Sequence, residues 1–216
     1  MREKVVLENV LPQDIERRSM EIIESEMART DLDPLEKPVV KRAIHTSADF
    51  DYLENLTFSS GAVAQTIEAL KNGATIVTDT NMAKAGINKK ALQDFGGEVL
   101  CFMADEDVAK AAKENGTTRA VACINKAAAL GKPVIFAIGN APTALVRIYE
   151  LVKEGKLSPQ LVIGVPVGFV NVVESKELIL DLGIPYIVAR GRKGGSNIAA
   201  AICNAMLYMA RDGVKA

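Results

Sequence analysis

The stretch that decides the fold is PVIFAIGNAPTALVRIYELVKEGKLSPQLVIGV, residues 133–165. It starts with an apolar run, passes through Gly-Asn-Ala-Pro into a longer amphipathic segment, and ends in a second apolar run. Short apolar runs are typical of strands covered on both faces, and the periodic segment between them is typical of a helix. The stretch therefore predicts two parallel strands joined by a crossover helix.

The same alternation extends over most of the chain. Apolar runs predict strands at 75–78, 98–103, 133–138, 161–165 and 185–189. Periodic segments predict helices at 89–95, 105–130 with an interruption at Asn115-Gly116, 142–154, 170–182 and 196–211. Three more helices are expected ahead of the sheet, at 13–27, 35–46 and 60–71, with Gly73 closing the third. We expect residues 1–216 to form a single α/β domain, with a doubly wound, mostly parallel sheet of about five strands and N-terminal helices.

Composition narrows the possible functions. The chain has 49% apolar and 25% charged residues and a net charge of −1, so no overall positive field would attract nucleic acid. Residues 1–11 mix charges with single apolar residues, unlike a signal peptide or anchor, and no segment reaches the roughly 20 apolar residues of a membrane helix. We expect a cytoplasmic protein without nucleic-acid or membrane partners.

The number and spacing of cysteine, histidine and glycine residues disfavour metals and common cofactors. Three cysteines lie far apart in apolar surroundings, which indicates buried reduced thiols, and the chain has one histidine, so a metal site of N and S ligands is not expected. The segment after the first predicted parallel strand, residues 78–82, lacks the GxGxxG pattern of dinucleotide sites. NAD, FAD and similar cofactors are therefore disfavoured.

Open parallel sheets bind ligands beyond the carboxyl ends of their strands, so the segments after each predicted strand are candidate ligand contacts. The most informative is RGRKGGS, residues 190–196, in which three cations and three glycines lead into a helix. Glycine-rich backbone and a helix start can together hold an anion. A solvated basic turn is an equally reasonable interpretation of this loop alone. Gly139-Asn140-Ala141-Pro142 also allows close approach of a ligand, although for this segment taken alone we favour a plain turn with proline at the first helical position.

Three further side chains attract attention. His45, at the end of the second expected helix, suits a proton donor because histidine changes its charge near neutral pH, although an isolated histidine is more often structural. Ser19 lies on an apolar helix stripe, where we favour a hydroxyl bonded to the preceding turn. Arg119 begins a helix, where a cation opposes the dipole, so we expect it to have a partner elsewhere, such as an acid of a ligand.

Seven segments in a fixed order resemble the precorrin-8X methylmutase (cobalt-precorrin-8 methylmutase) family. They are IERRSMEII (15–23), RAIHTSAD (42–49), TDTNMAKAG (78–86), Thr118-Arg119, GNAPTAL (139–145), GVPVGFVNVVESK (164–176) and GRKGGSNIAAAICN (191–204). The resemblance implies a cofactor-free isomerase of cobalamin biosynthesis that moves a methyl group from C11 to C12 of the corrin precursor, and a homodimer with its site near the subunit interface. It further implies that His45 is the catalytic acid. The residues expected to contact the tetrapyrrole are Ser19, Thr80, Arg119, Asn140, Arg192, Gly194, Gly195 and Ser196.

The chemistry fits these residues. A methyl shift within a conjugated ring needs a placed proton and a held conformation, and no nucleophile or metal. A substrate with about seven carboxylates accounts for scattered cations and N–H donors on a protein without net positive charge. Two alternatives stay open at this point: a non-catalytic corrinoid carrier, and an enzyme that acts on a phosphorylated metabolite through residues 191–196.

Overall fold

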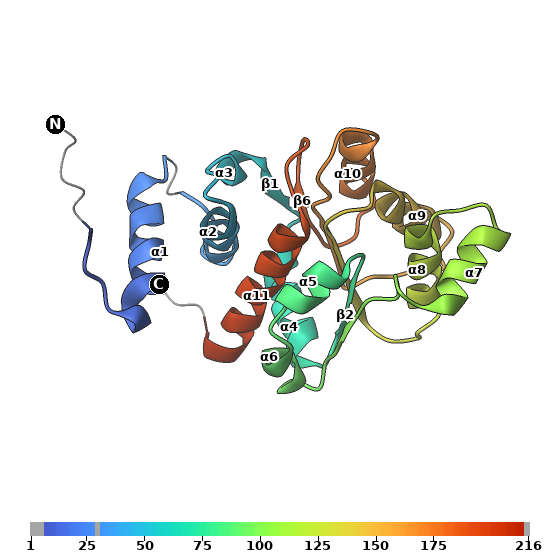
Figure 1. Cartoon of the computed structure of the whole chain (residues 1–216), viewed down its shortest axis with the longest axis horizontal. Helices are drawn as coiled ribbons and strands as arrows, with labels where there is room; N and C mark the ends of the chain where they lie inside the picture. Colours follow the sequence, from blue (N-terminus) through green and yellow to red (C-terminus); the bar gives the residue numbers. More distant parts are fainter. Residues whose placement is uncertain (1–6, 29–30, 214–216) are drawn as a thin grey trace.

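A six-stranded sheet organises the computed structural model, which describes residues 7–28 and 31–213 (Figure 1). Its order is β1-β6-β5-β4-β2-β3, with β2 to β6 parallel and β1 antiparallel to β6. The strands are β1 Leu56–Phe58, β2 Thr75–Thr78, β3 Val99–Leu100, β4 Val134–Ile138, β5 Leu161–Gly164 and β6 Tyr186–Ala189. The prediction of a doubly wound, mostly parallel α/β fold is confirmed.

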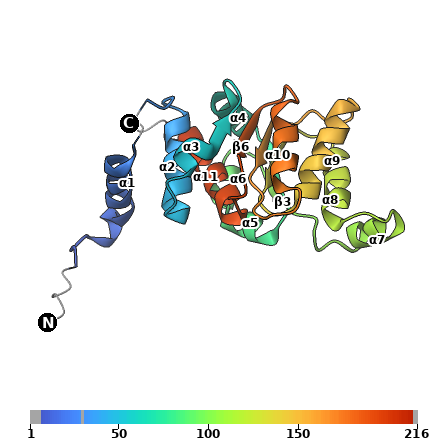
Figure 2. The ribbon, with the colours of Figure 1, turned by 90° about the horizontal axis from the view of Figure 1, so that it is seen from above.

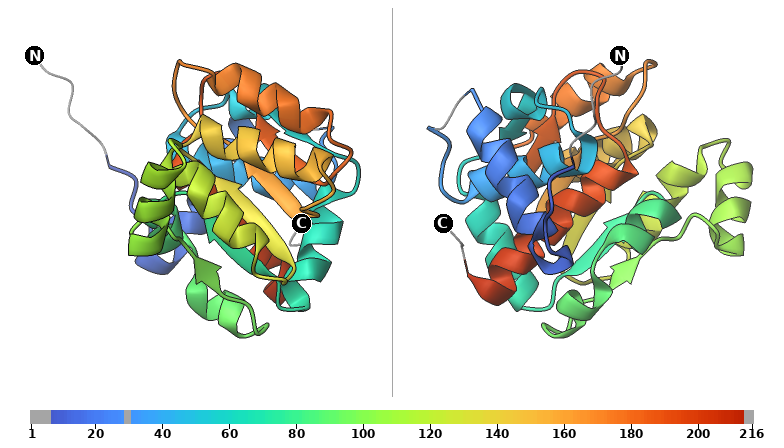
Figure 3. Two further views of the ribbon diagram at one scale, coloured as in Figure 1. Left: turned by 90° about the vertical axis from the view of Figure 1, so that its right-hand side faces the viewer. Right: turned by 60° about the vertical axis from the view of Figure 1, so that its left-hand side comes forward.

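Helices cover both faces of this sheet. On one side lie α1 Ile15–Glu26, α2 Glu36–Ser47, α4 Ala62–Lys71, α5 Asn81–Gly86, α6 Lys89–Gln93 and α11 Ser196–Asp212, and on the other α7 Glu106–Glu114, α8 Arg119–Ala128, α9 Pro142–Lys153 and α10 Val172–Leu180 (Figures 1 and 2). The short helices η1 Pro12–Asp14 and α3 Tyr52–Asn55 complete the described elements. Figure 3 shows α8, α9 and α10 lying side by side across the second face.

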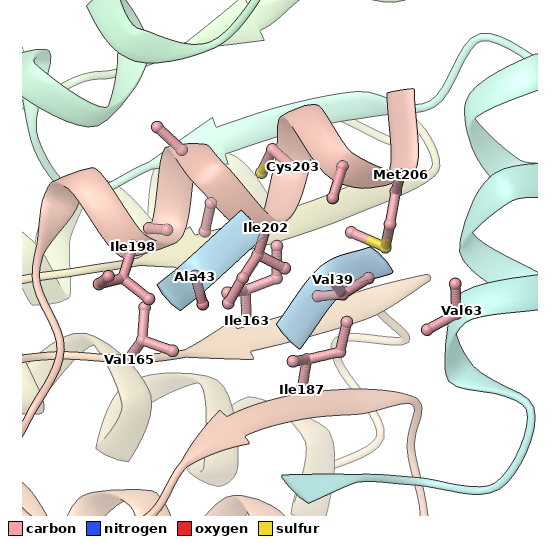
Figure 4. Packing of buried hydrophobic residues seen from close by; sticks show 14 of the residues in the cluster. Val39, Ala43, Val63, Ile163, Val165, Ile187, Ile198, Ile202, Cys203 and Met206 are labelled. Carbon is pink, nitrogen blue, oxygen red and sulfur yellow. The ribbon is translucent and has the colours of Figure 1, made fainter. Parts of the chain in front are cut away.

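Alternation along the strands produces two hydrophobic layers. In β4, Ile135 and Ala137 pack into the layer under α2, α4 and α11, whereas Phe136 and Ile138 pack into the layer under α8, α9 and α10. Figure 4 shows the first layer, where side chains of α2 and α11 meet those of β5 and β6. All five residues of β4 are buried, because a central parallel strand has no solvent-facing side.

The strand order creates a switch point between β2 and β4. The chain runs from β2 to the neighbouring edge strand β3 and then returns to the opposite side of β2 as β4. The segments that follow β2 and β4 therefore lead toward opposite faces, and such a switch point is the usual ligand position in open parallel sheets. This geometry selects Asp79-Thr80 and Gly139–Ala141 as the centre of a candidate site.

The sequence prediction was incomplete near the N-terminal part of the sheet. Strand β1 and helices α3 and α5 were not predicted, so the sheet has one more strand than expected, and only Val99–Leu100 of the predicted strand 98–103 forms β3. A three-residue strand has too few residues to show a period, and β1 depends on pairing with β6, which is far away in sequence. The interruption at Asn115-Gly116 was correct, since it separates α7 from α8.

Two remaining sequence inferences concern the chain ends and the thiols. Residues 1–6 of the segment expected to be neither signal peptide nor anchor lie outside the described residues. Among the helices of residues 7–28 and 31–213, none has both the length and the apolar character needed to cross a membrane. Cys101, Cys123 and Cys203 are free and buried, as predicted.

Candidate active site

A buried carboxylate joins the two segments at the switch point. Asp79 follows β2 and is only 2% exposed. Its Oδ1 accepts a hydrogen bond from the Gly139 N–H at 2.9 Å, and its Oδ2 accepts from the N–H groups of Asn140 and Ala141 at 2.8 and 2.7 Å. Burial raises the pKa of Asp79, and the three N–H donors act in the opposite direction by stabilising the carboxylate. Asp79 therefore fixes the backbone that carries Asn140.

Hydroxyl groups bring a third segment to the same place. The Thr80 side chain caps α5 by accepting a hydrogen bond from the Ala83 N–H, and its Oγ1 lies 2.7 Å from Oγ of Ser196, the first residue of α11. A Cβ atom on Gly139 would lie 2.7 Å from the Ser196 Cα, so only glycine allows this approach of β4 to α11. The predicted ligand residues Thr80, Asn140 and Ser196 are thus neighbours at one edge of the sheet.

The glycine-rich loop 191–195 is packed against the segment that follows β5. The Gly195 N–H donates to the Val165 carbonyl at 2.8 Å, and the Gly168 N–H donates to the Arg192 carbonyl at 3.2 Å. A Cβ atom on Gly194 would lie 2.1 Å from the Val165 carbonyl oxygen, which leaves no room for another side chain. These contacts hold the first turn of α11, whose N–H groups carry partial positive charge, next to the switch point.

Two of the three cations in segment 190–196 have acidic partners within the protein. Arg190 forms two hydrogen bonds with Glu177, and Lys193 lies 2.6 Å from Asp49 and 2.5 Å from Asp51. These carboxylates raise the pKa of Lys193. Among the described residues, Arg192 is the one of these three cations that makes no ion pair, and its role as a ligand contact stays a prediction. Its guanidinium lies 5.3 Å from the ring centre of Phe169.

Lys176, which the sequence analysis did not single out, binds the backbone of the glycine-rich loop. Lys176 of α10 has no exposed surface, and its Nζ donates to the carbonyl oxygens of Gly191 and Lys193 at 2.8 and 2.9 Å. Burial lowers the pKa of Lys176 to about 8. The helical period of the sequence contained a signal that Lys176 is buried, because it falls on the same face of α10 as Val172 and Ile179. All three residues are buried.

Arg119 approaches the same edge from the second helical layer. It is the first residue of α8 and is exposed. The preceding Thr118 caps α8 by accepting from the Val121 N–H, and its Oγ1 lies 3.0 Å from Oγ1 of Thr143, which follows the Asn140 turn. No ion pair of Arg119 occurs in the described part of the chain. The contact between Thr118 and Thr143 places the start of α8 beside the Asn140 turn, and a ligand contact for Arg119 stays a prediction.

His45 is exposed in the last turn of α2, beside the buried Ile44. The helix ends at Ala48, which has a left-handed backbone, and the chain then turns into Asp49. Since Asp49 and Asp51 bind Lys193, the turn after His45 is tied directly to the glycine-rich loop. His45 is thus carried by a segment in contact with the candidate site.

Ser19 lies farther out, on the peripheral helix α1 (Figure 2). Its hydroxyl donates to the Ile15 carbonyl at 2.8 Å, which is the local arrangement favoured from the sequence. Helix α1 is joined to α2 by an ion pair between Glu16 and Arg42 at 2.7 Å. No hydrogen bond in the described chain connects Ser19 to Thr80, Asn140 or Ser196, and a ligand role for it stays a prediction.

Two cavities, of about 640 and 330 Å³, lie away from the candidate site, the larger along α7, α8 and α9 and the smaller between the end of α1 and residues 50–55, and neither is lined by a predicted site residue. Large apolar side chains are exposed beside the site: Met82, Val167, Phe169 and Val170. No group of three acidic, histidine or cysteine side chains suited to a metal ion occurs within residues 7–28 and 31–213. The arrangement is suited to a large, partly apolar ligand with several acid groups.

Comparison with known proteins gives consistent matches over almost the full length. The family model for Precorrin-8X methylmutase matches residues 14–209. Cobalt-precorrin-8 methylmutase of Salmonella typhimurium is 46% identical over 207 residues, which cover 93% of this chain and 97% of that protein. The Priestia megaterium protein of the same name is 42% identical over 205 residues, covering 95% of this chain and 91% of the relative.

A solved structure gives the same result. The precorrin-8X methylmutase from Thermus thermophilus superimposes with a TM-score of 0.86 at 39% sequence identity, and the match covers 94% of this chain and 100% of that one. At this identity the likeness extends beyond the fold, and the coverage leaves no large unmatched part on either side.

Proposed function

The chain belongs to the precorrin-8X methylmutase family, and on that premise we propose that it catalyses the isomerase step of cobalamin biosynthesis in which a methyl group moves from C11 to C12 of the corrin precursor. The observation that carries the proposal is the family match across residues 14–209, which includes all the segments at the carboxyl edge of the sheet. The product is hydrogenobyrinate or its cobalt form. The names of the Salmonella and Priestia relatives favour the cobalt-loaded substrate.

The reaction is a rearrangement within one molecule. The bond from C11 to the methyl carbon breaks, the bond from C12 to the same carbon forms, and the double bonds of the ring shift, so the atoms balance without a co-reactant. The enzyme has to select the reactive tautomer and hold the ring in a productive conformation. We assign the proton to His45, acting as a general acid toward the ring.

The rest of the site recognises acid groups. Arg192 and Arg119 are exposed cations that can bind acid groups of the substrate. Thr80, Asn140 and Ser196 add polar side chains, and the first-turn N–H groups of α11 provide further donors. Gly194 and Gly195 stay in the predicted set of ligand contacts as part of the loop that carries Arg192, and Ser19 completes the set. Burial of Phe169 and Val170 against the flat ring would add apolar contact.

We also propose that two copies of the chain, each acting as one domain, assemble with the site near their interface. Helix α1 exposes Ile15 and Ile22, and the preceding Leu11 is exposed as well, so this outer helix has an apolar side that a second copy could cover. An interface there would remove these three apolar side chains from water. The cytoplasmic location inferred from the sequence stays a prediction.

The proposed function is tested by conversion of the C11-methylated substrate, supplied with and without cobalt. The enzyme should produce the corrin chromophore, which is followed by visible absorption, and His45→Ala should abolish conversion while still binding the product. Binding without conversion by the unaltered protein would instead identify a corrinoid carrier. Full turnover by His45→Ala would remove His45 from the mechanism.

A further inference from the structure

The position of Lys176 needs a physical reason, because a fully buried lysine is costly. Its side chain leaves water, and burial is the cause of its lowered pKa, with no carboxylate to offset the loss of hydration. Lys176 and Asp79 are the two charged side chains buried among the described residues. Asp79 holds the Asn140 turn, and the hydrogen bonds that Lys176 makes identify the segment that it holds.

Lys176 and its neighbours fix three successive carbonyl groups of the glycine-rich loop. Its Nζ donates hydrogen bonds to the carbonyl oxygens of Gly191 and Lys193, at 2.8 and 2.9 Å. The carbonyl between them, that of Arg192, accepts from the Gly168 N–H. All three oxygens are therefore bonded to donors of the protein. Without these donors, one or more of them could turn toward the ligand, where its partial negative charge would repel a carboxylate.

The same lysine influences a second segment through the loop. The residue whose carbonyl it binds, Lys193, extends its side chain to Asp49 and Asp51. Those two residues lie in the turn that follows His45. A shift of the Lys193 backbone would also move this turn. Lys176 is therefore linked, through Lys193, to both the acid-binding loop and the segment that carries His45.

We propose that Lys176 is a positioning residue: its buried amine keeps the carbonyl groups of residues 191 and 193 turned inward, so that Arg192 and the start of α11 face the acid groups of the substrate. The inference rests on the proposed function for the identity of that substrate. In this role Lys176 does not contact the ligand. It affects ligand binding only by fixing the backbone of the loop.

The test replaces Lys176 by methionine, which has similar length and no donor, and uses Lys110→Met on the exposed face of α7 as the matched control. Lys176→Met should raise KM and the product Kd at least ten-fold, with a smaller change in kcat. A variant that merely lost part of its folded population would show a lower apparent kcat and an unchanged KM. The control should match the unaltered enzyme in all three constants.

Trypsin gives a readout that needs no substrate, because the loop contains Arg190, Arg192 and Lys193. In Lys176→Met the folded protein should be cut within residues 190–193 at least ten-fold faster than the unaltered protein, without a lower Tm. Unchanged cleavage together with unchanged KM would overturn the proposal. If the substrate is not converted by the unaltered protein, the proposed function fails, and cleavage still decides the role of Lys176.

Hydrogen exchange on the unaltered protein covers the case in which Lys176→Met does not fold. If the loop is held as described, the amides of Gly168 and Gly195 exchange at least a hundred-fold more slowly than in an unstructured peptide, a margin of ~3 kcal/mol. Exchange at the rate of an unstructured peptide would show that the loop is not fixed, and the positioning role would be rejected.

Discussion

Asp79→Asn tests whether the buried carboxylate is the anchor of the switch point. The change keeps the shape of the side chain and removes one acceptor oxygen and the charge. If the amide oxygen takes the place of Oδ2, it can still accept from Asn140 and Ala141, at 2.8 and 2.7 Å in the parent structure. The amide NH2 then faces the Gly139 N–H, which loses its acceptor.

The expected loss of stability follows from these three contacts. An unsatisfied buried donor costs about 1–3 kcal/mol, and changing two charge-assisted bonds into neutral ones costs about 1 kcal/mol each. Removing a buried charge returns part of this sum, because burial raises the pKa of Asp79 and so opposes its ionisation. We expect the free energy of unfolding to fall by roughly 2–4 kcal/mol.

Urea denaturation followed by circular dichroism measures this loss, with Asp105→Asn as the control. Asp105 follows β3, its side chain is 37% exposed and its partner Lys126 also binds Asp107, so its loss should cost less than about 1 kcal/mol. The Asp79 variant should also bind the product more weakly, because the Asn140 turn is released. A loss no larger than that of the control would refute the reasoning, since it would mean that the three N–H bonds do not outweigh the cost of the buried charge.

Three further outcomes follow from the same geometry. Arg119→Ala should raise the product Kd at least ten-fold with little effect on Tm, because the guanidinium is exposed and is assigned only to the ligand; an unchanged Kd in an absorption titration would contradict that role. Gly194→Ala should lower the free energy of unfolding by about 1–3 kcal/mol or more in urea titrations, because the new Cβ would lie 2.1 Å from the Val165 oxygen. The control Gly155→Ala has open space around the new Cβ and should lose less stability. Burial lowers the pKa of Lys176 from 10.5 to about 8, so the folded state gives up this proton before the unfolded state does, and stability should rise between about pH 8 and 10.5 by at most about 3 kcal/mol. Thermal unfolding across that range should show the rise in the parent and not in Lys176→Met, and an equal rise in both would exclude Lys176 as its source.

Local sequence patterns were sufficient to predict the strands and helices that have a continuous apolar run or a clear helical period. The run 134–138 is apolar at every position, and the helix that follows it shows the helical period, so strand, helix and parallel pairing could all be inferred. The short strand β1 could not be inferred, because its three residues form a strand only when β6 offers its edge. In the site, sequence motifs marked Thr80, Asn140 and Ser196 individually, and the strand order then placed them together.

By itself the sequence determined the fold class, the family and the candidate ligand residues, because apolar periodicity and ordered motifs are properties of the chain read along its length. Only the tertiary structure decided which charges are available to a ligand. Lys193 and Arg190 looked equivalent to Arg192 in the sequence, yet folding places acids beside the first two and an aromatic ring beside the third. It likewise decided that Asp79 and Lys176 support the site from inside. Their partners are backbone groups distant in sequence, and an N–H or a carbonyl leaves no mark in the identity of the residue that carries it.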